Sequence, residues 1–251
     1  MFSKPLEKYI NSLRVKKQRN EQQCFIAEGE KTVSEFLNSR FQFEKIFFTE
    51  ACSLKSAMMK KVSEENLIVV NDFEMKKISE LKSPSTILAV IKMPSHSEAE
   101  KNITSGLHLV LDGIQDPGNL GTIIRIADWF GIETVFCSGN CVDIYNGKVV
   151  QAAMGSHAHL NVQEQNIEAL LSKTSLPKIL TVMESESTIY NSELPNNAFI
   201  IIGSEGSGVS ENITALCTQT ISIPRMGNAE SLNAAVATGI ICAAMRGKKI
   251  N

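Results

Sequence analysis

The sequence contains no hydrophobic run that approaches the roughly 18 residues of a membrane span, and its first twenty residues lack a signal-peptide core. Six cysteines are present, but none forms a C-x-x-C pair, so we expect free thiols in a reducing cytoplasm and no disulfide framework. The formal net charge of -2 excludes a generally basic surface for nucleic acid, although it allows a local basic patch. These absences favour a cytoplasmic globular protein without a membrane partner.

Several common catalytic signatures are also missing. No G-x-S-x-G sequence is present, which disfavours a serine hydrolase. The glycines of Gly203–Gly208 have the order G-x-x-G-x-G, the reverse of the dinucleotide-binding fingerprint, and no Lys-Ser/Thr pair follows to form a phosphate loop. His157 and His159 have the spacing of two metal ligands, but no third ligand stands at a diagnostic distance, so we expect no metal.

The pattern of apolar runs predicts two α/β domains. The first, residues 1–93, has short strands expected at 25–30, 44–49, 67–70 and 86–91. Residues 94–105 lose all periodicity and are rich in turn-forming and charged residues, which indicates a linker. Residues 106–251 alternate strands and helices, with strands expected at 107–111, 134–137, 179–182, 200–202 and 220–223. This alternation predicts a parallel sheet with helices on both faces.

The segment from Asn119 to Gly131 is the first candidate for chemistry. Asn119 is a plausible N-cap of a helix at 120–130, and Gly131 a plausible stop. The apolar stripe of this helix places Arg125 and Asp128 away from the core, toward solvent or a site. Taken alone, the segment is better explained as a capped surface helix with one exposed arginine.

Two further segments follow buried strands. Glu205 stands just past the strand at 200–202, where it is either a polar anchor or a solvated turn carboxylate. The segment 223–233 offers apolar and hydrogen-bonding side chains together, a mixture that suits a flat purine beside a ribose. Because the carboxyl ends of parallel strands meet at one edge of a sheet, these segments predict a ligand pocket there.

The three segments together resemble the SpoU group of the SPOUT superfamily, the S-adenosylmethionine-dependent RNA 2′-O-ribose methyltransferases. The matching motifs are 119–127, 202–208 and 223–233, and the intervening 148–155 agrees as well. Residues 25–33 are similar to a substrate-binding domain that resembles RNA-binding ribosomal proteins. The resemblance implies a C-terminal trefoil knot, a homodimer and S-adenosyl-L-methionine as cofactor.

The resemblance also implies roles for individual residues. Gly203, Ile223, Met226, Gly227 and Leu232 would bind the cofactor, whereas Asn119, Arg125, Glu205, Ser231 and Asn233 would form the catalytic group. A guanidinium is a poor base because its pKa exceeds about 12, so Arg125 is expected to hold an RNA phosphate and polarise the ribose hydroxyl. Gln151 departs from the family pattern, in which arginine is frequent at that position.

The resulting hypothesis is an RNA 2′-O-ribose methyltransferase that acts on ribosomal RNA. A transfer-RNA substrate is the alternative within the same class, and a non-catalytic RNA-binding assembly factor or a dinucleotide oxidoreductase are alternatives from other classes. A basic N-terminal run is expected either to capture RNA or to form a solvated helix face. It consists of Lys4, Lys8, Arg14, Lys16, Lys17 and Arg19.

Overall fold

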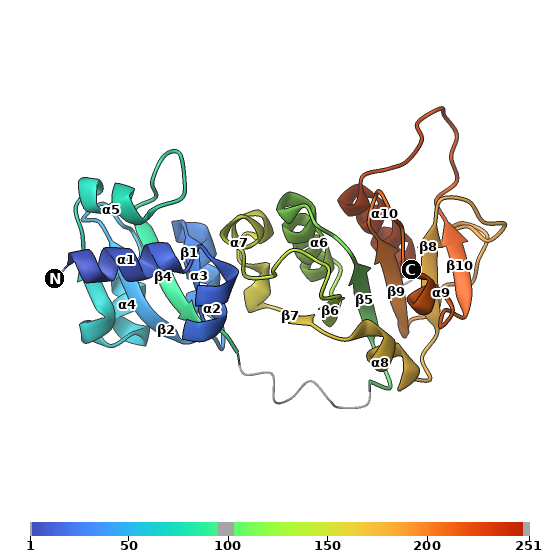
Figure 1. The fold of residues 1–251 in the computed structure, drawn as a ribbon, viewed down its shortest axis with the longest axis horizontal. Coiled ribbons are helices and arrows are strands. Elements are labelled where there is room, and N and C mark those ends of the chain that lie inside the picture. Colours follow the sequence, from blue (N-terminus) through green and yellow to red (C-terminus); the bar gives the residue numbers. More distant parts are fainter. Residues whose placement is uncertain (1, 95–102, 248–251) are drawn as a thin grey trace. The chain divides into compact units, whose positions relative to one another are not determined.

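The computed structural model describes residues 2–94 and 103–247, which form two compact units (Figure 1). The first unit combines residues 2–94 with the segment Tyr145–His159, and the second contains the remaining described residues. Most of the expected linker at 94–105 lies outside the described residues.

The first unit is built on a four-stranded mixed sheet in the order β1-β4-β2-β3. The strands are β1 (Cys24–Glu28), β2 (Phe43–Phe48), β3 (Leu67–Val69) and β4 (Ile87–Lys92). Strand β4 runs antiparallel to β1 and β2, and β2 runs parallel to β3. The helices are α1 (Lys4–Ser12), α2 (Lys16–Gln22), α3 (Glu30–Leu37), α4 (Lys55–Lys61), the 3₁₀ turn η1 (Glu64–Asn66) and α5 (Asp72–Ile78). All four predicted strands are therefore present.

Helix α5 was not predicted, although its start carries a local signal. The Asn71 side chain accepts a hydrogen bond from the Glu74 backbone N–H, and the Glu74 carboxylate accepts one from the Asn71 backbone N–H. This reciprocal capping box satisfies two backbone donors that a helix start otherwise leaves unpaired. Met75 and Ile78 of the helix are buried in the core of the first unit.

The segment Tyr145–His159 packs on the first unit through helix α7 (Gly147–Ala153) and the 3₁₀ turn η3 (Ser156–Ala158). The Tyr145 ring stacks on Phe25 of β1, with 4.6 Å between ring centroids. His159 Nε2 lies 3.2 Å from the Glu35 carboxylate. Strand β1 is therefore fully buried, because residues of α1 and α5 cover one face and aromatic residues, including Tyr145, cover the other.

The second unit contains a six-stranded parallel sheet in the order β10-β8-β9-β5-β6-β7, as predicted for a parallel α/β domain. The strands are β5 (Leu107–Asp112), β6 (Thr134–Cys137), β7 (Asn161–Glu164), β8 (Lys178–Val182), β9 (Ala198–Gly203) and β10 (Gln219–Ser222). The helices are α6 (Pro117–Trp129), α8 (Ile167–Ser172), α9 (Glu211–Thr214) and α10 (Ala234–Gly247).

The helices of the second unit form two packed groups. Helices α8 and α9 contribute Ile167, Leu171 and Ile213 to an apolar cluster with Phe199 and Ile201 of β9. Helices α6 and α10 pack against each other. Because successive side chains of a strand point to opposite faces, this pair covers the face of β9 opposite to Phe199 and Ile201. Between β10 and α10, Figure 1 shows a long loop that extends away from the sheet. This loop contains the third sequence motif.

Among residues 2–94 and 103–247 we find no membrane-spanning helix.

Candidate active site

Helix α6 begins earlier than the sequence pattern predicted. The prediction that Asn119 is the N-cap is wrong: Asp116 occupies that position, and its carboxylate accepts a hydrogen bond from the Asn119 backbone N–H at 2.7 Å. Pro117 follows as the first helical residue, where its missing N–H costs nothing. The side chain of Asn119 is therefore not needed for capping and is available for other partners. The predicted stop is confirmed, since Gly131 has φ 61° just past the helix.

Glu205 is held at the tip of a tight turn that follows β9. Ser204 and Gly208 exchange two backbone hydrogen bonds of 3.0 Å, which close the turn around Glu205. Gly203 is required at the base of this turn, because a Cβ there would lie 2.3 Å from the carbonyl carbon of Gly208. The glycine-rich composition of the second motif thus serves the close return of the backbone.

A single carboxylate oxygen joins the three motifs. Glu205 Oε1 accepts hydrogen bonds from Asn119 Nδ2 at 3.1 Å, from Asn233 Nδ2 at 3.0 Å and from the Ala234 backbone N–H at 3.0 Å. Asn233 Nδ2 also donates to Asn119 Oδ1 at 2.8 Å. We call these four residues the Glu205 cluster. The structure therefore brings together three of the five predicted catalytic residues.

Asn233 has a second role in this cluster, at the start of helix α10. Its Oδ1 accepts hydrogen bonds from the backbone N–H groups of Ala235 at 3.0 Å and Val236 at 3.3 Å. The Glu205 carboxylate faces the same helix start, where the helix dipole favours a negative charge. The orientation of the Asn233 side chain is consequently fixed from both ends.

The other two predicted catalytic residues lie outside the Glu205 cluster. Arg125 is exposed on α6, two turns beyond Asn119, and Ser231 is exposed in the loop between β10 and α10. Neither residue is buried in the single chain.

The predicted cofactor residues lie at the carboxyl ends of β9 and β10 and in the loop that follows β10. Gly203 and Ile223 are half-buried, whereas Met226, Gly227 and Leu232 are exposed, Met226 to 92% and Leu232 to 46%. Strand β8 lies between β10 and β9, so the segment after β8 borders the same region.

Sequence analysis did not predict that the segment after β8 belongs to this region. Glu184, two residues beyond β8, accepts a hydrogen bond from Arg225 at 2.9 Å, and this contact ties the loop after β10 to the end of β8. Met183 beside it exposes 70% of its surface. Only the order of strands in the sheet indicates that these residues adjoin the predicted pocket.

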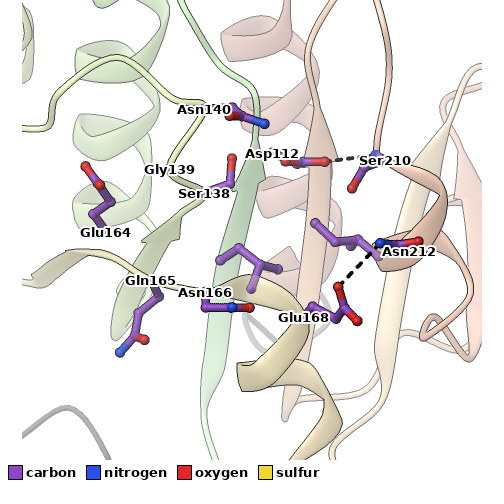
Figure 2. Close-up of a pocket in the computed structure, with 12 residues that line it drawn as sticks. Asp112, Ser138, Gly139, Asn140, Glu164, Gln165, Asn166, Glu168, Ser210 and Asn212 are labelled. Atoms are coloured by element: carbon purple, nitrogen blue, oxygen red, sulfur yellow. Dashed lines mark hydrogen bonds between the residues drawn. The ribbon is translucent and has the colours of Figure 1, made fainter.

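An open polar pocket of about 530 Å³ lies elsewhere in the second unit, at the carboxyl ends of β5, β6 and β7 (Figure 2). Its lining includes the carboxylates of Asp112, Glu164 and Glu168 and no lysine, arginine or histidine. Asp112 accepts a hydrogen bond from the Ser210 backbone N–H at 2.8 Å, and Asn212 donates to Glu168 at 3.5 Å. The acidic lining makes this pocket unsuitable for an RNA phosphate.

The two histidines considered as metal ligands are not arranged as a site. His157 is buried, whereas His159 pairs with Glu35. No group of three or more side chains suited to a metal ion occurs in the described part of the chain.

Comparison with known proteins now assigns the chain to a family. The profile of the SpoU rRNA methylase family matches residues 106–243, and that of the MRM3-like substrate-binding domain matches residues 4–89. The chain belongs to the SpoU rRNA methylase family. It is an S-adenosylmethionine-dependent RNA ribose methyltransferase, as the three motifs predicted.

Relatives of this SpoU methylase match over nearly its whole length. The 23S rRNA (guanosine(2553)-2'-O)-methyltransferase RlmP of Bacillus subtilis is 31% identical over 247 residues, which are 94% of this chain and 93% of RlmP. A solved structure from Porphyromonas gingivalis, assigned to the TrmH family of RNA methyltransferases, has a TM-score of 0.86 at 33% identity and covers 99% of this chain and 100% of its own.

The fold is shared more widely. The SpoU methyltransferase AviRb from Streptomyces viridochromogenes, solved in complex with AdoMet, has a TM-score of 0.86 at 22% identity, with 98% of each chain covered. The trefoil knot was predicted from the family resemblance, and family membership continues to imply it.

Proposed function

We propose that this SpoU methylase transfers a methyl group from S-adenosylmethionine to a ribose 2′-hydroxyl of ribosomal RNA. The observation that carries the proposal is the Glu205 cluster, in which the three family motifs meet on one carboxylate oxygen. The choice of ribosomal RNA is supported by full-length similarity to RlmP, whose name gives 23S rRNA as its substrate.

The residues at the ends of β8, β9 and β10 fit the cofactor. Exposed apolar side chains of Met183, Met226 and Leu232 are available to cover an adenine ring, and the tight turn after Gly203 presents backbone groups for hydrogen bonds. We therefore assign cofactor binding to Gly203, Ile223, Met226, Gly227 and Leu232, together with the segment after β8. The bound cofactor supplies a methyl group that its positively charged sulfur has already activated for transfer.

The chain then has to align the ribose hydroxyl and manage one proton. Arg125 holds the adjacent RNA phosphate and polarises the hydroxyl, because its guanidinium is a fork of donors and not a base. Asn233 and Ser231 fix the position of the hydroxyl oxygen. Glu205 acts on Asn119 and Asn233 by fixing their amide groups, so it is a positioning residue, and the proton leaves to phosphate or water.

Residues 1–93 are proposed to capture the RNA. The profile match to a substrate-binding domain supports this, as do four exposed lysines of helices α1 and α2. These are Lys4, Lys8, Lys16 and Lys17. Arg19 does not belong to this group: it is only 2% exposed and donates to the Leu13 carbonyl oxygen at 2.8 Å. We name the four lysines the lysine strip.

A homodimer is proposed from the exposed apolar surface of the α6 and α10 pair. Trp129 exposes 84% of its surface and Val236 exposes 52%, and a second copy of the chain could cover these apolar side chains. Trp129→Glu should therefore shift the protein from dimer to monomer in sedimentation velocity, whereas the exposed Phe73→Glu on α5 should not. We also place the protein in the cytoplasm, as its six free cysteines suggest.

The deciding experiment maps 2′-O-methyl sites on all RNA from a strain that lacks the gene. We expect one ribosomal-RNA site to lose its methyl group and to regain it with the wild-type gene. Arg125→Lys should bind the cofactor normally but fail to restore the site, since lysine keeps the charge and loses the planar fork. A site lost from transfer RNA alone would contradict the substrate, and full rescue by Arg125→Lys would contradict the mechanism.

A further inference from the structure

Two cysteines lie close together in the fold at the end of β6. Cys137 is the last residue of the strand, and a turn closed by a hydrogen bond from the Cys141 N–H to the Ser138 carbonyl oxygen, at 2.9 Å, returns the chain to it. Cys141 Sγ lies 3.3 Å from the carbonyl oxygen of Leu111, and Leu111 is the residue that pairs with Cys137 in the sheet, so the two cysteines meet at this end of β6. Cys137 is fully buried, and Cys141 is 8% exposed.

The environment makes Cys141 the more reactive member of the pair. The hydrogen bond from Cys137 lowers the pKa of Cys141 to about 7, against the opposing effect of burial, and Ser138 and the backbone N–H groups of Gly113 and Ile114 lower it further. The same hydrogen bond, together with burial, raises the pKa of Cys137. Burial is the main cause of the raised pKa of the other four cysteines, at 24, 52, 217 and 242. A thiolate beside a protonated thiol is the usual arrangement of a peroxide-sensitive pair.

The turn between the two cysteines borders the open polar pocket. Ser138, Gly139 and Asn140, the three residues between the thiols, line the open polar pocket (Figure 2). Hydrogen peroxide is little larger than water, so it can reach the turn that carries Cys141 from this side.

The turn is also bonded to the segment that leads into the active site. Cys141 Sγ donates to the Leu111 carbonyl oxygen at 3.3 Å, and Ser138 Oγ accepts from the Gly113 N–H at 3.1 Å. The Val142 N–H donates to the Ile114 carbonyl oxygen at 2.8 Å. Residues 111–114 connect β5 to the start of α6, the helix that carries Asn119. The turn is thus hydrogen-bonded to the segment that leads into the helix of Asn119.

We propose that hydrogen peroxide oxidises Cys137 and Cys141 to a reversible disulfide and that this oxidation slows methyl transfer; the second part rests on the proposed function. The Cys141 thiolate attacks a peroxide oxygen, so that an S–O bond forms, the O–O bond breaks and hydroxide leaves as water after protonation. Cys137 then attacks the sulfenic sulfur, which forms the S–S bond, and the oxygen departs with the Cys137 proton as a second water.

The test is a peptide mass measurement on the intact wild-type protein. Trypsin cleaves after Arg125 and Lys148, and the peptide between them contains Cys137 and Cys141 as its only cysteines. After peroxide and alkylation, we expect this peptide to appear unalkylated and about 2 Da lighter than the reduced form, since a disulfide loses two hydrogens. Dithiothreitol should restore two alkylation sites. Cys137→Ala should instead leave a sulfenic acid on Cys141 that dimedone captures, and Cys141→Ser should give neither product.

Methyl transfer is measured on the same samples. The control variant is Cys217→Ser, which removes a different, half-buried cysteine of the same unit. Peroxide should reduce methyl transfer at least several-fold in the wild type and in Cys217→Ser, with recovery on reduction, and should spare Cys141→Ser. A peptide that keeps both alkylation sites would overturn the disulfide. A disulfide with unchanged methyl transfer would overturn its effect on activity. A reduced protein with no methyl transfer at all would contradict the proposed function and leave the disulfide result standing.

Discussion

At the scale of single residues, the Glu205 cluster separates what the sequence predicts from what it does not. The family motifs assigned Asn119, Glu205 and Asn233 to one site, and the structure shows that these three side chains are hydrogen-bonded neighbours. The motifs did not reveal that one oxygen of Glu205 serves three donors. Side-chain hydrogen bonds across 86 residues of chain depend on the placement of whole elements, which no local pattern encodes.

Glu205→Gln tests the positioning role. Glutamine keeps the size of the side chain but removes the charge that strengthens three hydrogen bonds. A hydrogen bond to a charged group contributes at most about 1.5–3 kcal/mol, and the solvent exposure of Glu205 reduces that contribution. We expect kcat/KM to fall about tenfold or more, mainly through kcat, with little change in cofactor affinity. Glu211→Gln, an exposed carboxylate in the first turn of α9, is the matched control and should stay near the wild type. Normal turnover of Glu205→Gln would remove Glu205 from the mechanism.

The basic N-terminal run shows how little the sequence predicts about the role of a single charged residue. Charge in the sequence predicted six cations on one surface, yet Arg19 is buried and Arg14 pairs with Glu80 and with the carbonyl oxygens of Ile78 and Ser79. Arginine provides five donors on a long stem, so it serves as a structural bridge as readily as a ligand for phosphate. Composition alone does not distinguish these uses.

At the scale of elements, the strands with apolar runs were predicted, whereas the short polar strand β7 was not. Strand β9 is buried along nearly its whole length, which gives a clear signal. Strand β7 has one buried residue in four, and α8 has six residues, so neither produces a usable periodicity. The polar pocket adjoins β7 and α8, and for that reason sequence analysis overlooked it.

The loop between β10 and α10 carries the next prediction. Leu232→Asp would place a carboxylate against the adenine, so we expect cofactor affinity to weaken by about tenfold to a hundredfold, which corresponds to about 1–3 kcal/mol for burying a polar group without a partner. Isothermal titration calorimetry measures the change directly. Met59→Asp introduces the same charge at an exposed apolar position of the first unit and should leave the affinity unaltered. Equal affinities for both variants would place the cofactor elsewhere.

At the scale of the whole molecule, the lysine strip is best tested without removing a domain. Tyr145, Val149, Val150 and Ala153 are buried in the first unit, so a chain that begins after residue 93 would expose an apolar surface and would be expected to aggregate. Loss of RNA binding in such a truncation would then have no clear meaning. Charge substitutions on the surface of α1 avoid this difficulty.

Lys4→Glu together with Lys8→Glu should weaken RNA binding and reduce its dependence on salt. Each lost contact to a single-stranded phosphate lowers the slope of log affinity against log salt by about 0.7, so the slope should fall by about 1.4. The same pair of changes at the exposed Lys60 and Lys82 is the control for net charge. Filter binding over a range of salt concentrations gives both slopes. If the two double variants behave alike, the lysine strip is not a specific contact.

The Glu205 cluster also bears on how fast the enzyme becomes active as the chain folds. Its hydrogen bonds join residues separated by 86 and 114 positions, whereas a helix turn closes over four. Contacts between distant parts of a chain form slowly, because a long loop has to be ordered before they contribute any stability. Strand β5 pairs with β9 across a similar separation, from Leu107 to Ala198, so we expect the amides of Asn119 and Asn233 to meet only once this pairing has formed. During refolding, activity should return after the secondary structure is complete.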